Sequence, residues 1–170
     1  GLEYVLKQSG PMTMGASQVC GFAKSDPSKE TPNLQFHVQP ISTDILGASR
    51  LHDFDGITPT VANIRPSSRG EISIISNDSR INPKIKMNYL STQDDRIVAA
   101  QGLKLVRKIM LESETFKKYE PEEYRPGVHI TDNEELVKAG SEFTQTIFHP
   151  VGTCKMGKDD NAVVNDKLYT

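Results

Sequence analysis

The sequence predicts an α+β domain in which helices lie on one face of an antiparallel sheet. Two observations support this fold class. Segments with the alternating pattern of strands come first, before about residue 90, and segments with helical spacing follow between about residues 92 and 143. Strands grouped ahead of helices favour an antiparallel sheet with segregated helices. A chain of 170 residues is long enough for one such domain with a core, so residues 1–170 are expected to form a single packed unit.

The first 33 residues predict a short helix, a strand and a loop. Apolar residues within 2–6 indicate a helical turn, and Gly10-Pro11 ends it because proline lacks an amide donor and disfavours helix in the residue before it. Residues 17–23 predict a strand. The segment 24–33 is rich in Ser, Pro, Lys and Asp, which favours an exposed loop.

Two further strands are predicted at residues 34–39 and 57–64. In the first, apolar and polar residues alternate with the period of a half-buried strand, and Pro40 closes it. His37 therefore points away from the face that carries Phe36, where it could line a pocket or be half exposed. Pro59 places the second strand at a sheet edge or at a bulge, because proline cannot donate to the ladder.

A hairpin and two helices are predicted next. Residues 71–76 and 85–89 alternate as strands do, and the polar turn between them indicates a β-hairpin. A Ser-x-x-acid signal at residues 91–94, followed by apolar residues on one side at helical spacing, predicts a helix over about 92–113. A second start signal at residues 131–134 predicts a shorter helix through Phe143.

Composition excludes several classes of function. The formal net charge of −2 gives no single-sign field, so nucleic acid is not an expected partner. No apolar run approaches the roughly 20 residues that a membrane-spanning helix needs, and the N-terminus shows no signal pattern. Cys20 and Cys154 cannot form the multi-bridge framework of small secreted domains, which favours a reducing compartment. We therefore expect a protein without a transmembrane segment, in the cytoplasm or peripheral at the cytoplasmic membrane.

The segment 148–157, "FHPVGTCKMG", is the main candidate for a chemical site. Pro150 fixes its own φ and Gly152 allows close backbone approach, so the segment is expected to be rigid and non-helical and to hold His149 in place. A positioned histidine can accept a proton near neutral pH, which typically contributes about 10²–10⁴-fold in rate. The spacing alone leaves two interpretations open, a catalytic base and a hydrogen-bonded structural histidine.

The remaining polar residues allow both functional and structural interpretations. His149, Cys154 and Cys20 could supply three zinc ligands, but they lack the paired short spacing of structural zinc sites, so no metal is expected. A Cys154 nucleophile activated by His149 competes with a buried, inert thiol. The arginines of "RPSSRG", Arg65 and Arg69, could bind an anion or form salt bridges in a surface turn.

The segment 148–157 closely resembles the signature of the glucose–methanol–choline (GMC) family of flavin-dependent alcohol oxidoreductases, especially its choline dehydrogenase-like branch. The resemblance extends over most of the chain. Further stretches look like family stretches in family order: "GPMTMGASQVCGFAKSD", "PNLQFHVQP", "RPSSRGEISIISND" followed by "INPKIKMNYLSTQDD", and "PGVHITDNEEL".

The resemblance implies the substrate-binding domain of an FAD enzyme, an antiparallel sheet of about six strands flanked by helices, with residues 67–170 as the C-terminal GMC region. It implies that His149 faces the flavin and is the catalytic base for a small-molecule alcohol. By similarity, His37 is a candidate for positioning the substrate. The implied reaction oxidises a primary alcohol, with choline favoured, to the aldehyde, as the carbinol carbon gives up hydride to FAD.

The chain departs from the family pattern in two respects. It contains no Gly-x-Gly-x-x-Gly and no Walker-type loop, so the nucleotide-binding fingerprint of the FAD-binding domain is missing. The C-terminal segment that supplies the second active-site His or Asn in the family is missing too. The chain is therefore similar to an excised substrate-binding lobe, which alone is expected neither to hold FAD firmly nor to turn over.

Several alternatives stay open. Recognition of choline needs aromatic faces or a carboxylate around the quaternary ammonium, and the chain has no Trp, so another aliphatic or aromatic alcohol is the alternative substrate. A non-catalytic binding module that retains the fold is an alternative from a different class. The sequence leaves open whether oxygen or a respiratory quinone accepts the electrons, and what the oligomeric state is.

Overall fold

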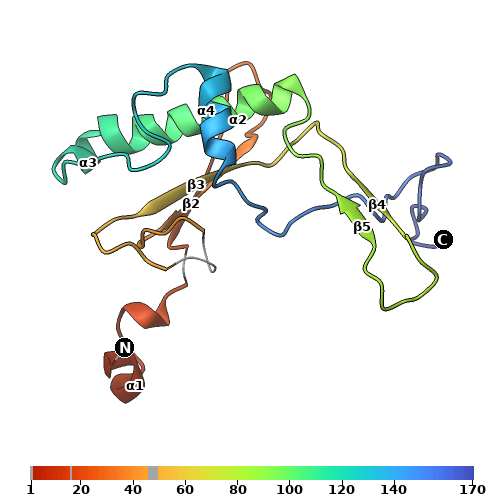
Figure 1. Cartoon of the computed structure of the whole chain (residues 1–170), viewed down its shortest axis with the longest axis horizontal. Helices are drawn as coiled ribbons and strands as arrows, with labels where there is room; N and C mark the ends of the chain where they lie inside the picture. Colours follow the sequence, from red (N-terminus) through yellow and green to blue (C-terminus); the bar gives the residue numbers. More distant parts are fainter. Residues whose placement is uncertain (1, 16, 46–49) are drawn as a thin grey trace. The chain divides into compact units, whose positions relative to one another are not determined.

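The computed structural model describes residues 2–15, 17–45 and 50–170 (Figure 1). The chain divides into two compact units. Unit 1 comprises Gly1–Ser68 and Leu90–Thr144, and unit 2 comprises Arg69–Tyr89 and Gln145–Thr170. Antiparallel strands and helices occupy separate stretches of the chain, which confirms the α+β class. No helix among the described residues is long and apolar enough to span a bilayer.

Unit 1 contains a three-stranded antiparallel sheet in the order β1-β2-β3. The strands are β1 (Val19–Ala23), β2 (Leu34–Gln39) and β3 (Thr58–Asn63), close to the three places where strands are predicted. In the register of the sheet, Pro59 of β3 lies opposite Val38 of β2. Because β3 is an edge strand, the missing amide of Pro59 is tolerated there, which confirms its predicted edge position.

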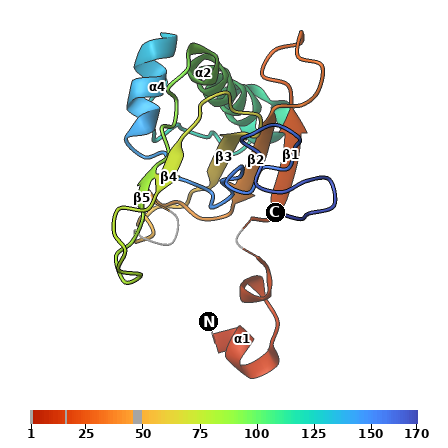
Figure 2. The ribbon, with the colours of Figure 1, turned by 90° about the vertical axis from the view of Figure 1, so that its right-hand side faces the viewer.

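The helices of unit 1 cover one face of this sheet. Helix α2 (Gln93–Arg107) lies over the sheet and packs against α4 (Asn133–Ser141), as Figures 1 and 2 show. Gly102 permits the close approach, because a Cβ at this position would lie 3.1 Å from Val61 Cγ2 of β3. In the part of the chain that the structure describes, the core consists of five buried apolar residues from the sheet and the two helices: Leu34, Val98, Ala100, Leu136 and Val137.

Both long helices begin with side-chain caps close to the predicted start signals. The Thr92 hydroxyl accepts a hydrogen bond from the amide of Asp95, and the Asp132 carboxylate accepts from two amides of the first turn of α4. Helix α2 continues as a π-helix, Lys108–Glu112, and α3 (Glu114–Lys117) follows it. The predicted helix over about 92–113 is therefore confirmed, with a π-helical last turn in place of an α-helical one. The N-terminal α1 (Leu2–Lys7) and a 3₁₀ turn (Pro11–Thr13) contain no buried residue.

Unit 2 contains a short antiparallel hairpin of β4 (Glu71–Ser73) and β5 (Lys84–Lys86). Ile72 lies opposite Ile85, as the predicted hairpin requires. Strand β4 ends three residues earlier than the alternation suggests, and Ile74 beyond it is 87% exposed. The hairpin is therefore confirmed in place and is shorter than expected.

The expectation of about six strands is wrong for the described residues, which contain five strands in two separate sheets. The segment between β2 and β3 adds only one isolated bridge, between Thr43 and Leu51. In the described part of the chain, no strand pairs with the outer edge of β1. Among the described residues, the sheet of unit 1 therefore ends after three strands.

A buried carboxylate of α2 fixes the turn that follows β3. Asp95, in the first turn of α2, is 3% exposed. Its Oδ1 accepts hydrogen bonds from the Ser67 amide at 2.8 Å and from Asn63 Nδ2 at 3.2 Å, and its Oδ2 accepts from the Ser68 amide at 2.9 Å. Burial raises the pKa of Asp95, but the hydrogen bonds from Ser68 and Ser67 outweigh burial and hold the pKa below 3.8.

We expect Asp95→Asn to lower the free energy of unfolding by about 2–3 kcal/mol at neutral pH, because hydrogen bonds to a charged acceptor are replaced. A carboxylate with a lowered folded-state pKa stabilises the fold above its unfolded-state pKa, and this contribution is lost as pH falls through the folded-state pKa. Urea denaturation at pH 7 and at pH 3 should therefore show a smaller difference between variant and wild type at pH 3. An equal difference at both pH values would contradict this role.

Candidate active site

His149 lies in unit 2, in an irregular segment that follows α4 and the end of unit 1. The preceding residue, Phe148, has a φ of 63°, a left-handed conformation that is strained for a bulky side chain. The Phe148 amide donates a hydrogen bond to Thr146 Oγ1 at 3.0 Å, and Pro150 fixes the backbone on the other side. His149 thus lies between Phe148, whose backbone is strained, and Pro150, whose φ is fixed. The segment is non-helical, as predicted.

The imidazole of His149 is exposed and makes no hydrogen bond to any residue that the structure describes. The interpretation of His149 as a hydrogen-bonded structural histidine is therefore not supported within residues 2–15, 17–45 and 50–170. Both ring nitrogens remain available to a bound molecule. A histidine in this condition can accept a proton from a ligand hydroxyl, because no protein group competes for its lone pair.

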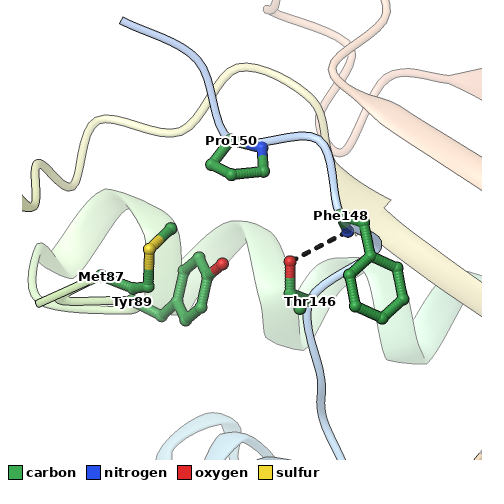
Figure 3. A pocket seen from close by; sticks show the side chains of 5 residues that line it. All are labelled: Met87, Tyr89, Thr146, Phe148 and Pro150. Carbon is green, nitrogen blue, oxygen red and sulfur yellow. Dashed lines mark hydrogen bonds between the residues drawn. The ribbon is translucent and has the colours of Figure 1, made fainter. Parts of the chain in front are cut away.

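An apolar cavity of about 350 Å³ lies beside this segment (Figure 3). Its lining comes from two residues after β5, from the two neighbours of His149 and from one residue shortly before them: Met87, Tyr89, Phe148, Pro150 and Thr146. Met87 and Tyr89 were not predicted as site residues. Their alternation with Ile85 indicated only a strand, and nothing in that pattern places the end of the hairpin beside residues 146–150.

The second half of the motif is held by a compact turn. Lys155 Nζ lies 2.7 Å from Asp159 Oδ2, and the Lys155 carbonyl accepts hydrogen bonds from the amides of Val163 and Val164 at 2.8 and 3.2 Å. The Gly157 amide donates to the Val164 carbonyl at 3.0 Å. Residues 155–164 therefore anchor the C-terminal side of the His149 segment within unit 2.

Gly152 provides the one turn in the motif that requires a glycine, since its φ is 113°. Gly152→Ala is expected to lower the free energy of unfolding of unit 2 by about 1–3 kcal/mol, through backbone strain. No atom lies within 4 Å of the added Cβ, so the effect is conformational. Gly21→Ala is the matched control, because Gly21 also has free space and no positive φ. Hydrogen exchange of residues 145–157 measures the loss of stability in unit 2. Equal effects of Gly152→Ala and Gly21→Ala on this exchange would refute the role of the positive φ.

His37 lies in the middle of β2 in unit 1, opposite Cys20 of β1 and Thr60 of β3. Residues directly opposite each other in a sheet point to the same face, so these three side chains share the face that α2 does not cover. This confirms that His37 points away from Phe36. The ring is half-buried, and the His37 carbonyl accepts a hydrogen bond from Thr60 Oγ1 at 3.3 Å. His37 belongs to unit 1 and His149 belongs to unit 2.

The turn "RPSSRG" binds a carboxylate of the chain itself. Its two serine amides bind Asp95, so the turn acts as an anion-binding loop for an internal partner. Arg65 lines a second cavity, of about 210 Å³ in unit 1, together with Lys29, Glu30 and Asp94. The two cations and two carboxylates of this lining give it no net charge, and Lys29 Nζ lies 3.3 Å from Asp94. This cavity therefore lacks the positive field that a dinucleotide diphosphate needs.

Both cysteines are free and exposed, so the expectation of a buried Cys154 is wrong. Cys154 follows Gly152 in an open turn of unit 2, where no apolar side chains enclose it. Cys20 Sγ accepts a hydrogen bond from Gln35 Nε2 at 3.5 Å. Within the described ranges, no three His, Cys, Asp or Glu side chains come together as a metal site.

Comparison with protein families gives one clear match. The model of the C-terminal region of GMC oxidoreductases matches residues 66–170. An alcohol dehydrogenase [acceptor] of Pseudomonas putida is 35% identical over 166 residues, which are 98% of this chain and 30% of the relative. An oxygen-dependent choline dehydrogenase of Proteus mirabilis is 34% identical over 165 residues, which are 97% of this chain and 29% of the relative. The chain thus spans about 30% of the length of these relatives.

Solved structures show the same fold. A formate oxidase of Aspergillus oryzae superposes with a TM-score of 0.80 at 22% identity, over 98% of this chain and 33% of the oxidase. Pyridoxine 4-oxidase from Mesorbium loti superposes with a TM-score of 0.78 at 22% identity, over 90% of this chain and 30% of the oxidase.

Proposed function

Because this chain belongs to the GMC oxidoreductase family, we propose that it is the substrate-binding part of a longer FAD-dependent enzyme that oxidises a primary alcohol to the aldehyde. The observation that carries the proposal is the exposed imidazole of His149, without a hydrogen-bond partner among the described residues, between Phe148 and Pro150 at an apolar cavity. The left-handed φ of Phe148 adds support, because such strain is concentrated at functional sites. We propose a cytoplasmic location, free or peripheral at the membrane.

The fit of FAD to these residues is partial. The apolar neighbours of His149 suit an uncharged ring system, and the charge-balanced cavity at Lys29 and Arg65 does not suit a diphosphate. Phe148 is 81% exposed and Val151 is 95% exposed, which is apolar surface that a ligand or another part of the parent enzyme would cover. We propose that parts of the parent outside this chain hold FAD, and that residues 1–170 alone neither hold it firmly nor turn over.

In the proposed mechanism, His149 removes the hydroxyl proton of the alcohol. FAD, when bound, supplies the acceptor for the hydride that leaves the carbinol carbon. The imidazolium that forms at His149 stabilises the alkoxide electrostatically, so the same group acts as base and as counter-charge. Phe148 and Pro150, which line the apolar cavity, flank His149 in the chain. His37 is proposed to position the substrate.

Choline is the favoured substrate, and its support is the identity of 32–34% to several oxygen-dependent choline dehydrogenases over 97% of this chain. Another primary alcohol is the second candidate. The alcohol dehydrogenase [acceptor] of Pseudomonas putida is as similar, at 35% identity, and the described surface around His149 contains no carboxylate in the cavity lining to attract a quaternary ammonium.

Anaerobic mixing of the full-length parent with choline and with a panel of neutral primary alcohols tests the proposal. Loss of visible flavin absorbance reports hydride transfer. Bleaching by choline supports the favoured substrate, and bleaching only by other alcohols supports the second candidate. If no alcohol bleaches the flavin, the proposed oxidation is wrong and a non-catalytic module that kept the fold takes its place.

A further inference from the structure

Unit 2 carries the segment 148–157 but contains no buried residue, and the structure describes all of this unit. The buried apolar residues in the described ranges of the chain all belong to unit 1. In unit 2, Ile74 is 87% exposed, Phe148 is 81% exposed and Val151 is 95% exposed. A unit without an apolar core has little to offset the conformational entropy that it loses on ordering. Unit 2 therefore needs a surface that covers it.

The hairpin of β4 and β5, labelled in Figure 2, has one apolar and one polar face. Ile72 lies directly opposite Ile85 in the register, so their side chains share one face, and they are 50% and 60% exposed. Successive residues of a strand point to opposite faces, so Ser73 and Lys84, which also lie opposite each other, share the other face. We call Ile72 and Ile85 the hairpin face.

The loop of the hairpin adds exposed apolar side chains in a hydrogen-bonded turn. The Asp78 carboxylate accepts hydrogen bonds from the Arg80 amide at 3.0 Å and from Arg80 Nη2 at 2.7 Å, and the Asp78 carbonyl accepts from the Ile81 amide at 3.0 Å. Ile75 and Ile81, before and after Asp78, are 60% and 52% exposed. A two-stranded hairpin is marginally stable in water and becomes stable when its apolar face packs on other structure. The hairpin face therefore requires a partner.

The rest of the parent enzyme is the partner that the comparisons favour. The chain spans about 30% of the length of its relatives, so most of each relative lies outside the matched part. The side chains of Ile72 and Ile85 offer no hydrogen-bonding group, and a polar group buried against them without a partner costs free energy. The complementary surface is therefore apolar and uncharged.

A lipid surface fits the hairpin less well. Binding to anionic lipids combines apolar insertion with basic residues that reach the same surface. Lys84 belongs to the face opposite Ile85, so it points away from a bilayer that Ile85 would enter. The Arg80 guanidinium in the loop is paired with Asp78 at 2.7 Å, which offsets its charge. The charge pattern thus favours a protein partner over a membrane.

We propose that the hairpin face, Ile72 and Ile85, docks on an apolar surface of the parent enzyme that lies outside residues 1–170. Met87 and Tyr89, which follow β5, line the cavity beside the His149 segment, so docking of the hairpin also fixes one wall of that cavity. The proposal rests on the chain being part of a longer enzyme, as proposed above. It does not rest on the alcohol oxidation, because docking is measured without substrate.

Thiol labelling of the full-length parent tests the docking. Ile72→Cys and Ser73→Cys place a thiol at adjacent residues that point to opposite faces of β4, so Ser73→Cys is the matched control. In the parent, a maleimide should label Ile72→Cys at least about tenfold more slowly than Ser73→Cys, because a covered thiol reacts only in local openings. In the chain 1–170 alone, the two rates should agree within about threefold. Peptide mass spectrometry distinguishes the introduced thiol from Cys20 and Cys154, which are exposed.

Three results would overturn the docking. Equal rates in the parent would show that the hairpin face is not covered there, and slowing of Ile72→Cys only after addition of phosphatidylglycerol vesicles would assign the face to a lipid surface. Labelling of Ile72→Cys that is already slow in the chain 1–170 would show that the chain itself or a second copy covers the face.

Two further comparisons keep the test decisive. If Ile72→Cys prevents folding of the parent, Ile85→Cys with Lys84→Cys as its control gives the same comparison on β5, and equal rates there overturn the docking. A parent that oxidises no alcohol but labels Ile72→Cys slowly would support the docking and contradict the proposed function.

Discussion

His149→Ala in the full-length parent enzyme is expected to slow alcohol-dependent flavin reduction by about 10²–10⁴-fold, the usual contribution of a positioned general base. The imidazole is exposed and has no hydrogen-bond partner among the described residues, so its removal leaves no buried group unsatisfied. The loss should therefore appear in the rate of reduction at saturating alcohol, with little change in stability. Stopped-flow absorbance under anaerobic conditions measures this rate.

Two control variants distinguish the loss of a proton-accepting group at His149 from other changes in the motif. Cys154→Ala removes the other reactive side chain of the motif, and it should leave the rate unchanged because Cys154 is exposed and has no role in the proposed mechanism. His149→Gln keeps hydrogen bonding but cannot take up the proton, so it should be nearly as slow as His149→Ala. A His149→Ala enzyme that reduces its flavin at the wild-type rate would remove His149 from the mechanism.

Glu123→Ala is expected to lower the free energy of unfolding by about 3–5 kcal/mol, because it leaves Arg107 as an uncompensated charge in a mostly buried site. The side chains of Arg107 and Glu123 are only 15% and 10% exposed. Arg107 Nε and Nη2 donate to the two carboxylate oxygens at 2.7 and 2.9 Å, and Arg107 also donates to the carbonyls of Ile130 and Gly127 at 2.6 and 2.8 Å.

Urea denaturation measures the loss, and Glu114→Ala provides the comparison. Glu114 pairs with Lys117 at the surface, so its removal should change the free energy of unfolding by at most about 1 kcal/mol. Replacing both Arg107 and Glu123 with Met and Leu should recover much of the loss, because a buried pair can often be exchanged for apolar residues of similar volume. Similar losses from Glu123→Ala and Glu114→Ala would show that the buried pair is not a structural anchor.

Local patterns predicted much of unit 1. The strands at residues 34–39 and 57–64 follow from alternation and proline, and the helices beginning after Thr92 and Asp132 follow from caps and helical spacing. These features are encoded within a few residues of each other, so the sequence reveals them directly.

Long-range contacts could not be predicted in the same way. Arg107 and Glu123 are 16 residues apart, and Ser67 binds Asp95 across 28 residues. Nothing in the spacing of these residues states that they meet, because their approach depends on how the helices pack on the sheet. The same limit applies to Met87 and Tyr89, whose cavity beside His149 forms only once the hairpin and the motif segment come together.

The uncovered edge of β1 has a practical consequence for work with the excised chain. Its outer backbone amides and carbonyls have no ladder partner among the described residues, and Val19 and Phe22 on this strand are each 60% exposed. Such an edge is a template on which an extended polypeptide can add a strand, including another copy of the same chain. Preparations of residues 1–170 will therefore tend to self-associate as concentration rises, and a charged residue placed at Phe22 offers a direct means of keeping them monomeric.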